Sequence, residues 1–116
     1  MKNVRDPRHR RRIKLMEHLF TVSFGGARVH RALVNIMPHL SKLDDRIALA
    51  APEWPVAKIA KIDLAILRLA TYELLIVRKE PPKVIIDEAI ELAKSFGNTQ
   101  SSKFVNGVLG TILASP

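Results

Sequence analysis

The 116-residue chain contains no cysteine, so it forms no disulfide and offers no thiolate ligand to a metal ion. It also has no apolar run long enough to span a membrane. No apolar stretch with a small-residue cleavage site follows the charged N-terminus, which argues against a secretory signal. These absences predict a cytoplasmic protein that has no membrane partner.

The sequence also lacks the usual signals of catalysis and of bound cofactors. Its histidines form no H-x-x-H or H-E-x-x-H pattern, and no glycine-rich loop is present to hold a phosphate. Glu88 and Glu91 form a pair of carboxylates, but acids early in a helix are already favoured by the helix dipole. We therefore expect no enzymatic activity, no metal site and no cofactor. The four histidines are His9, His18, His30 and His39.

Positive charge is concentrated at one end of the chain. The first 14 residues carry seven basic side chains and one acid, a formal charge of +6 out of +8 for the whole chain. Such a cluster is typical of a surface that binds a polyanion, because cations held near phosphates release condensed counterions. A solvated basic tail is the alternative. The basic residues are Lys2, Arg5, Arg8, Arg10, Arg11, Arg12 and Lys14.

Apolar residues at helical spacing continue through the first half of the chain. They predict a helix over residues 13–24, which Gly25 and Gly26 end. Pro38 lacks an amide donor, so we expect a break near Met37 and a new helix over residues 44–51. The segment 52–55, with two prolines around Trp54, reads as a rigid connector between two halves.

The second half predicts three further helices. A long apolar stripe covers residues 59–76, with Asp63 as a candidate cap inside it. Residues 84–94 could start as a strand, but strong helix formers follow directly and favour a helix ending at Gly97. Ser101 or Ser102 can cap the last helix.

The predicted fold class is therefore all-α, with short helices packed in two small halves of a single domain, residues 1–116. Gly107 is unexpected within the last helix, since a helical glycine costs about 1 kcal/mol relative to alanine. We expect another helix to pack so closely against it that a Cβ would clash.

An ordered series of motifs runs through the second half of the chain. It resembles the NusB family of bacterial transcription antitermination factors almost continuously from Trp54 to Ile112, with the arginine run leading into Leu19-Phe20 as a further match. Relative to that family, the segment between Phe24 and Trp54 is short, so the resemblance implies a basic arm with a shortened N-terminal helical half over residues 1–53 and a C-terminal helical half over residues 54–116. The motifs are IDLAILRLA (residues 62–70), YELL (72–75), PKV (82–84), DEAIELAKSFG (87–97) and FVNGVL (104–109).

The resemblance implies a protein that binds boxA-type single-stranded RNA together with a small-subunit ribosomal protein, NusE. It implies that this pair joins RNA polymerase and promotes read-through of terminators, notably in ribosomal RNA operons. No catalysis is implied. The short first half leaves the oligomeric state open, with a homodimer as one expectation.

The resemblance also implies roles for individual residues. Arg10, Arg11 and Arg12 align with the family's RNA-binding arm, and Phe20 aligns with an aromatic position where a ring can stack on a base. For Phe20, core packing is an equally good interpretation. For the arginines, the alternative is a disordered tail.

Further implied contacts lie in the second half of the chain. Phe104 is the preferred ring for stacking on a base, with Gln100 and Lys103 beside it. Tyr72 and Glu73 are candidate contacts to the ribosomal protein, although Glu73 could instead pair with Arg68 or Lys79. Trp54 and Phe96 read as packing residues, with Trp54 covering the seam between the halves.

Two other functions compete with RNA-dependent antitermination. A similar helical module precedes the catalytic domain of a ribosomal RNA cytosine methyltransferase family, so this chain could be an accessory to such an enzyme. It carries no catalytic cysteine and no glycine-rich cofactor loop of its own. The other alternative is a protein-binding adaptor whose basic residues have no ligand.

Overall fold

Helices and short helical turns make up the fold. The computed structural model describes residues 6–26 and 28–115, and no strand occurs among them, so the predicted all-α class is confirmed. No helix in these two ranges is long and apolar enough to cross a membrane. The α-helices are α1 (Pro7–Val22), α2 (Leu40–Ala50), α3 (Lys61–Tyr72), α4 (Pro82–Phe96) and α5 (Ser101–Ala114). The shorter turns are the 3₁₀ turns η1 (Arg31–Leu33), η2 (Met37–His39) and η3 (Val56–Lys58), and the π-helical turn η4 (Glu73–Val77).

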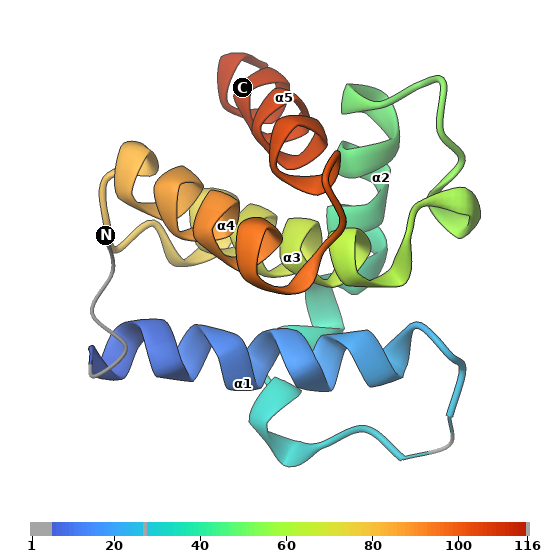
Figure 1. Cartoon of the computed structure of the whole chain (residues 1–116). Helices are drawn as coiled ribbons and strands as arrows, with labels where there is room; N and C mark the ends of the chain where they lie inside the picture. The colour runs from blue at the N-terminus through green and yellow to red at the C-terminus, as the bar shows by residue number, and fades with distance from the viewer. Residues whose placement is uncertain (1–5, 27, 116) are drawn as a thin grey trace.

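Helix α3 lies at the centre of the molecule (Figure 1). Every residue from Asp63 to Thr71 is buried, because α1 covers one side of this helix while α2, α4 and α5 pack around the rest. Such all-round burial requires an apolar sequence, and residues 64–67 and 69–70 are all aliphatic. One consequence is that α3 offers a partner mainly its two ends, and most of the accessible surface belongs to the other helices and the connecting segments.

A single apolar core joins the two halves of the chain. Each α-helix contributes fully buried side chains to it, spaced three or four residues apart as expected for one face of a helix. The largest of these side chains are Met16, Leu19, Leu43, Ile47, Ile66, Leu67, Ile85, Leu92, Leu109 and Ile112.

Helix α1 begins earlier than the apolar pattern indicates. The carboxylate of Asp6 accepts a hydrogen bond of 2.9 Å from the backbone N–H of Arg8, and Pro7 occupies the first turn, where its missing N–H has no cost. Because of this cap, the segment from Arg8 to Arg12 is helical rather than a frayed tail. Lys2 and Arg5 lie outside the described residues.

The predicted break at Pro38 is confirmed. Pro38 lies in η2, and α2 starts directly after it, at Leu40. Upstream, the Nδ1 atom of His30 accepts a hydrogen bond of 3.0 Å from the N–H of Ala32 and so caps η1. The ring of His30 stacks on His18 of α1 with 3.7 Å between centroids, which holds this connection against α1.

An ion pair fixes α2 to α3. Arg68 donates two hydrogen bonds of 2.8 Å from its Nε and Nη2 atoms to the carboxylate of Asp44. The side chain of Arg68 is 9% exposed, so its charge needs this partner. The alternative pairing of Arg68 with Glu73, considered from the sequence, is therefore wrong.

The expectation for Gly107 is also wrong. A Cβ built at Gly107 or at Gly110 would meet no atom within 4 Å, so no helix packs closely against either residue. Close packing occurs instead at Gly97, between α4 and α5. A Cβ there would lie 2.3 Å from the Oγ atom of Ser101 and 2.8 Å from the carbonyl oxygen of Ala93.

We expect Gly97→Ala and Gly107→Ala to change stability in opposite directions. At Gly97 the new methyl group must displace the Ser101 hydroxyl, which accepts a hydrogen bond from Asn98 N–H, so a loss of about 1 to 3 kcal/mol should follow. At Gly107 the methyl group enters open space, and helix propensity should add up to about 1 kcal/mol. Urea denaturation of both variants measures the two effects. A destabilised Gly107→Ala variant would contradict the open environment of that residue.

Candidate nucleic-acid interface

The three consecutive arginines of α1 point in different directions. Successive residues of an α-helix are rotated by about 100°, so Arg10, Arg11 and Arg12 cannot share one face. Arg10 and Arg11 are exposed, whereas Arg12 is only 7% exposed and points into the protein. The structure therefore does not present the arginine run as one continuous cationic surface.

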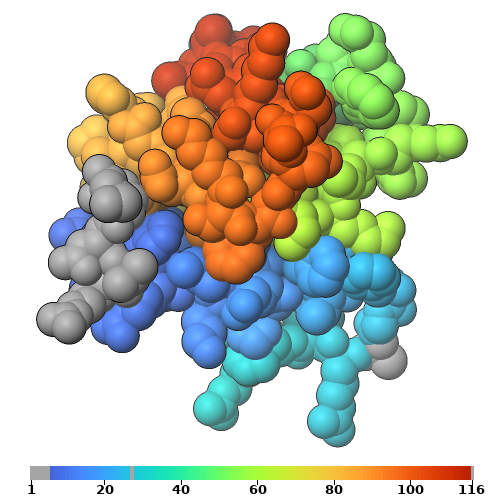
Figure 2. Space-filling model, in the orientation of Figure 1, coloured from blue at the N-terminus to red at the C-terminus, as the bar shows by residue number. Residues whose placement is uncertain are grey.

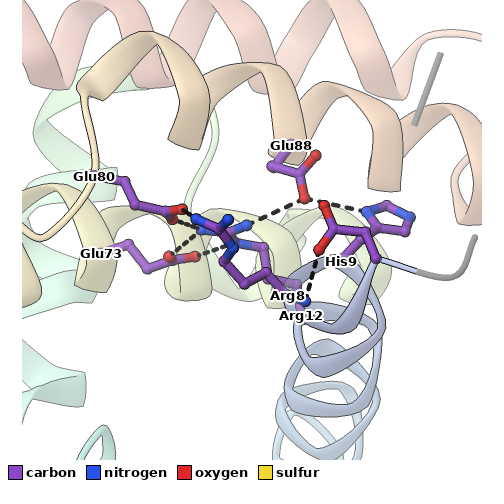
Figure 3. Close-up of polar contacts among 7 residues, drawn as sticks. Arg8, His9, Arg12, Glu73, Glu80 and Glu88 are labelled. Carbon is purple, nitrogen blue, oxygen red and sulfur yellow. Dashed lines mark hydrogen bonds and ion pairs between the residues drawn. The ribbon is translucent and has the colours of Figure 1, made fainter. Parts of the chain in front are cut away.

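Arg12 is held by three carboxylates (Figure 3). Its Nε and Nη2 atoms donate hydrogen bonds of 2.9 and 2.7 Å to the two carboxylate oxygens of Glu73. Its Nη1 atom lies 3.1 Å from Glu88, and its Nη2 atom also contacts Glu80. These carboxylates come from η4, from α4 and from the segment between them, so one guanidinium joins α1 to the C-terminal half.

Two neighbours extend this cluster. The Nδ1 atom of His9 lies 3.2 Å from the same oxygen of Glu88, and both side chains are buried. Arg8 donates a hydrogen bond of 3.1 Å to Glu80, but its side chain is 75% exposed. Arg8 therefore keeps most of its guanidinium accessible at the surface, while His9 belongs to the interior.

The cluster shifts the protonation equilibria of its members. For Arg12, the hydrogen bonds and charge of Glu73 outweigh the opposing effect of burial and raise its pKa further above its already high ordinary value. For Glu80, burial acts to raise the pKa, but the hydrogen bonds and charges of Arg12 and Arg8 together exceed that effect and lower it. Ionised Glu80 therefore stabilises the folded protein.

The two residues expected to contact a protein partner lie beside this cluster. Glu73 is engaged by Arg12, so of the pairings considered from the sequence, neither Arg68 nor Lys79 is its partner. Tyr72 is half-buried, and its ring lies tilted against His39 with 5.9 Å between centroids.

A groove lies at the opposite end of α1. It has a volume of about 510 Å³ and is bounded by the end of α1, the start of α3 and the junction between α4 and α5. Its aromatic residues are Phe20, Phe24 and Phe96, and Phe24 is 62% exposed. Its polar residues are Lys61, Asp63, Asn98 and Ser101.

Two phenylalanine rings of this groove pack against each other, and a lysine ammonium group lies over one of them. Phe20 and Phe24 lie edge to face with 5.0 Å between centroids, and Lys61 Nζ is 5.3 Å from the centre of the Phe24 ring. Phe20 also packs against the core, which confirms the packing interpretation, while stacking on a base stays a prediction. An exposed ring beside an ammonium group suits a nucleobase with its attached phosphate.

The start of α5 continues the surface beyond the groove. Gln100 and Lys103 are exposed, and Phe104 is half-buried, one turn into the helix. Trp54 meets the Phe104 ring edge to face, with 6.4 Å between centroids, and is 53% exposed. The interpretation of Trp54 as a plug over a seam is therefore wrong, because much of its indole faces solvent.

These segments lie on one face of the molecule. Figure 2 shows the start of α1 in dark blue, the α4–α5 junction in orange and the segment around residues 54–61 in yellow-green on the same side. Sequence reasoning missed Phe24, Lys61 and Trp54 as members of this surface. Only Phe24 carried a signal, because it follows Phe20 by one helical turn.

Taken together, these observations describe a small helical protein that gathers exposed rings and cations on one face. The sequence profile described as "NusB family" matches residues 25–114. The chain belongs to the NusB family.

Individual relatives extend this result. The chain is 51% identical over 87 residues to the transcription antitermination protein NusB of Chloroflexus aggregans, a match covering 73% of this chain and 58% of that protein. It is 50% identical over 92 residues to the corresponding protein of Roseiflexus castenholzii, covering 77% and 65%. The chain thus spans about three fifths of the length of these two relatives.

A solved structure matches over nearly the whole chain. The structure titled "T. maritima NusB, P3121, Form 2" superposes with a TM-score of 0.86 at 34% identity, covering 99% of this chain and 94% of that one. The arrangement of helices described above is therefore that of a NusB protein, the first half included.

Arg12→Ala should be strongly destabilising. The substitution leaves three carboxylates close together without their shared cation, and breaking a buried ion pair typically costs about 3 to 5 kcal/mol. Arg11→Ala is the matched control, since it removes an exposed arginine next in sequence and should change stability by less than about 0.5 kcal/mol. Urea denaturation at neutral pH measures both. Equal effects would show that the cluster contributes nothing.

Glu80→Gln should reduce the loss of stability in acid. In the native chain the pKa of Glu80 is lower when folded than when unfolded, so its contribution is present above the ordinary glutamate range, near pH 4.5, and is lost as the pH falls below it. As the pH falls below about 4.5, the free energy of unfolding should fall less steeply in the variant, by at most about 1.4 kcal/mol per pH unit. Denaturation curves across this range measure the slope, and identical slopes would contradict the assignment.

Proposed function

We propose that this protein is a transcription antitermination factor that binds boxA-type single-stranded RNA. The observation that carries the proposal is the groove at the end of α1, where exposed phenylalanine rings lie beside Lys61 on the same face as the start of α5. Rings that stack on bases and cations that meet phosphates are the two elements of single-strand recognition. The names of the relatives point to the same activity.

The proposal assigns separate roles to the residues of this surface. Phe104 and Phe20 stack on unpaired bases, with Trp54 supporting the ring of Phe104. Arg10 and Lys103 contact phosphates, and Gln100 donates a hydrogen bond to a base or sugar. Arg12 acts as a positioning residue that fixes α1 rather than as an RNA contact, because its donors are engaged by carboxylates.

The same proposal includes the protein partners. A small-subunit ribosomal protein, NusE, binds beside the RNA, and the complex joins RNA polymerase in the cytoplasm. Tyr72 is kept as a candidate contact to this partner because its ring is partly accessible, while Glu73 acts mainly through Arg12. The protein acts by binding and not as an enzyme, and association into a homodimer would have to leave the groove accessible.

Salt titration of RNA binding tests the proposal. If four to six phosphates are contacted, the logarithm of the affinity should fall with the logarithm of salt concentration with a slope of about −3 to −4. Arg10→Ala should reduce this slope by about 0.7, while Phe104→Ala should weaken binding by about 1 to 3 kcal/mol with an unchanged slope. Fluorescence anisotropy with a boxA-like RNA, with and without the ribosomal protein, measures both.

The control for this experiment is Lys42→Ala, which removes an exposed cation from α2 that lines neither the groove nor its neighbours. It should leave affinity and slope unchanged. Circular dichroism checks that Phe104→Ala remains folded. Partner binding without any RNA preference would favour the adaptor function instead.

A further inference from the structure

A second cavity lies on the other side of α1, next to the Arg12 cluster. Its volume is about 440 Å³, within the range of small-molecule sites. It is formed by the first turns of α1, the end of α3, the turn η4 and the segment that follows η4. The lining residues are Arg8, Arg11, Arg12, Leu15, Leu69, Tyr72, Glu73, Val77, Lys79 and Glu80.

The floor of this cavity is apolar and includes an aromatic ring. Leu15, Leu69 and Val77 supply aliphatic surface, and the half-buried ring of Tyr72 lies among them. A flat ring-shaped ligand can therefore bury its faces there. A bare phosphate ion would make no use of this floor.

The residues that line the cavity include four basic side chains and only two carboxylates. Glu73 and Glu80 both hold Arg12, and Glu80 also receives a hydrogen bond from Arg8. Arg11 and Lys79 form no ion pair with any described residue, 6–26 or 28–115. An anionic group at the mouth of the cavity would meet two cations that form no ion pair within residues 6–26 and 28–115.

The backbone around the cavity is irregular where Val77 and Lys79 are placed. The helix widens into the π-helical turn η4, and such turns often occur at functional sites. Arg78 then takes a left-handed conformation with a φ of 54°, which is unfavourable for a residue other than glycine. The fold maintains this strain at the edge of the cavity.

The cavity is separate from the aromatic groove. Arg11 and Leu15 differ by four residues and share one side of α1, whereas Phe20, on another side of α1, and Phe24, in the turn after it, line the groove. The buried side chains of Arg12, Met16 and Leu19 lie between them. A ligand in one site therefore does not occupy the other.

We propose that this cavity binds a nucleoside phosphate. The base packs on Leu15, Leu69 and Tyr72, and the phosphate meets Arg11 and Lys79. This combination of an apolar aromatic floor with a cationic rim fits a base joined to a phosphate better than a purely apolar segment. The ligand is either a free mononucleotide or one nucleotide of an RNA that passes around the start of α1, and only the second source depends on the proposed function.

The first test uses the whole chain and free adenosine and uridine 5′-monophosphates. Nuclear magnetic resonance titration should move the signals of Leu15, Tyr72 and Val77, with inorganic phosphate binding at least tenfold more weakly. Val77→Trp fills the cavity without changing charge and should lower the affinity for the nucleotide at least tenfold. Leu113→Trp is the matched control, because Val77 is 43% and Leu113 48% exposed, and only Val77 lines the cavity.

The second test applies the same pair of variants to RNA. If the nucleotide belongs to bound RNA, Val77→Trp should weaken RNA binding about tenfold, and Leu113→Trp should not. Removing the base at one position of the RNA should then abolish the difference between the Val77→Trp and native proteins. Thermal denaturation confirms that both variants are folded.

The outcomes separate the two proposals. If Val77→Trp loses mononucleotide binding, the cavity binds a free mononucleotide. If Val77→Trp loses only RNA affinity, the cavity binds one nucleotide of the RNA. If the native protein binds RNA but Val77→Trp changes neither measurement, the cavity proposal is wrong and the proposed function stands. If the native protein binds no RNA, the proposed function fails, and the mononucleotide titration alone decides for or against the cavity.

Discussion

One buried guanidinium determines how the first helix lies on the rest of the molecule. Arg12 reaches from α1 to carboxylates on η4, on α4 and on the segment between them, and all three side chains are at most 17% exposed. A charge in such a place is tolerated only with its partners, so any sliding or rotation of α1 would leave four charges unpaired. Apolar packing around Met16 and Leu19 stabilises the contact between α1 and the other helices. It fixes the position of α1 less precisely than a bidentate ion pair does.

The fixed position of α1 gives its two exposed sides different surroundings. One side ends in a groove with phenylalanine rings and Lys61, and the other borders a cavity with Tyr72 and Lys79. Both surfaces combine apolar rings with cations, yet they lie on opposite sides of the same helix. A basic run of consecutive residues therefore does not form one patch: Arg12 positions the helix, and Arg10 and Arg11 are exposed in different directions.

The sequence was sufficient to predict the helices but not to predict several of the tertiary contacts between them. Apolar spacing, Pro38 and the glycine at residue 97 predicted the helices because these signals are local. Burial of Arg12 depends on Glu73, Glu80 and Glu88, more than 60 residues away, and periodicity contains no information about such pairing. The same limit explains the errors at Trp54, whose indole contacts Phe104 but is half exposed, and at Gly107, against which no helix packs closely.

The exposed arginines of α1 are difficult to explain by folding alone. The N-terminal end of a helix carries partial positive charge, and a cation there costs about 0.3 to 1 kcal/mol. The first turn of α1 contains no acid to offset this, and only Asp6, at the cap, supplies a carboxylate. Arg12 is compensated by its three carboxylates, whereas Arg10 and Arg11 gain no ion pair within the described part of the chain. Charges that oppose the helix dipole and pair with no described carboxylate would be offset by an external anion, which is what both proposals supply.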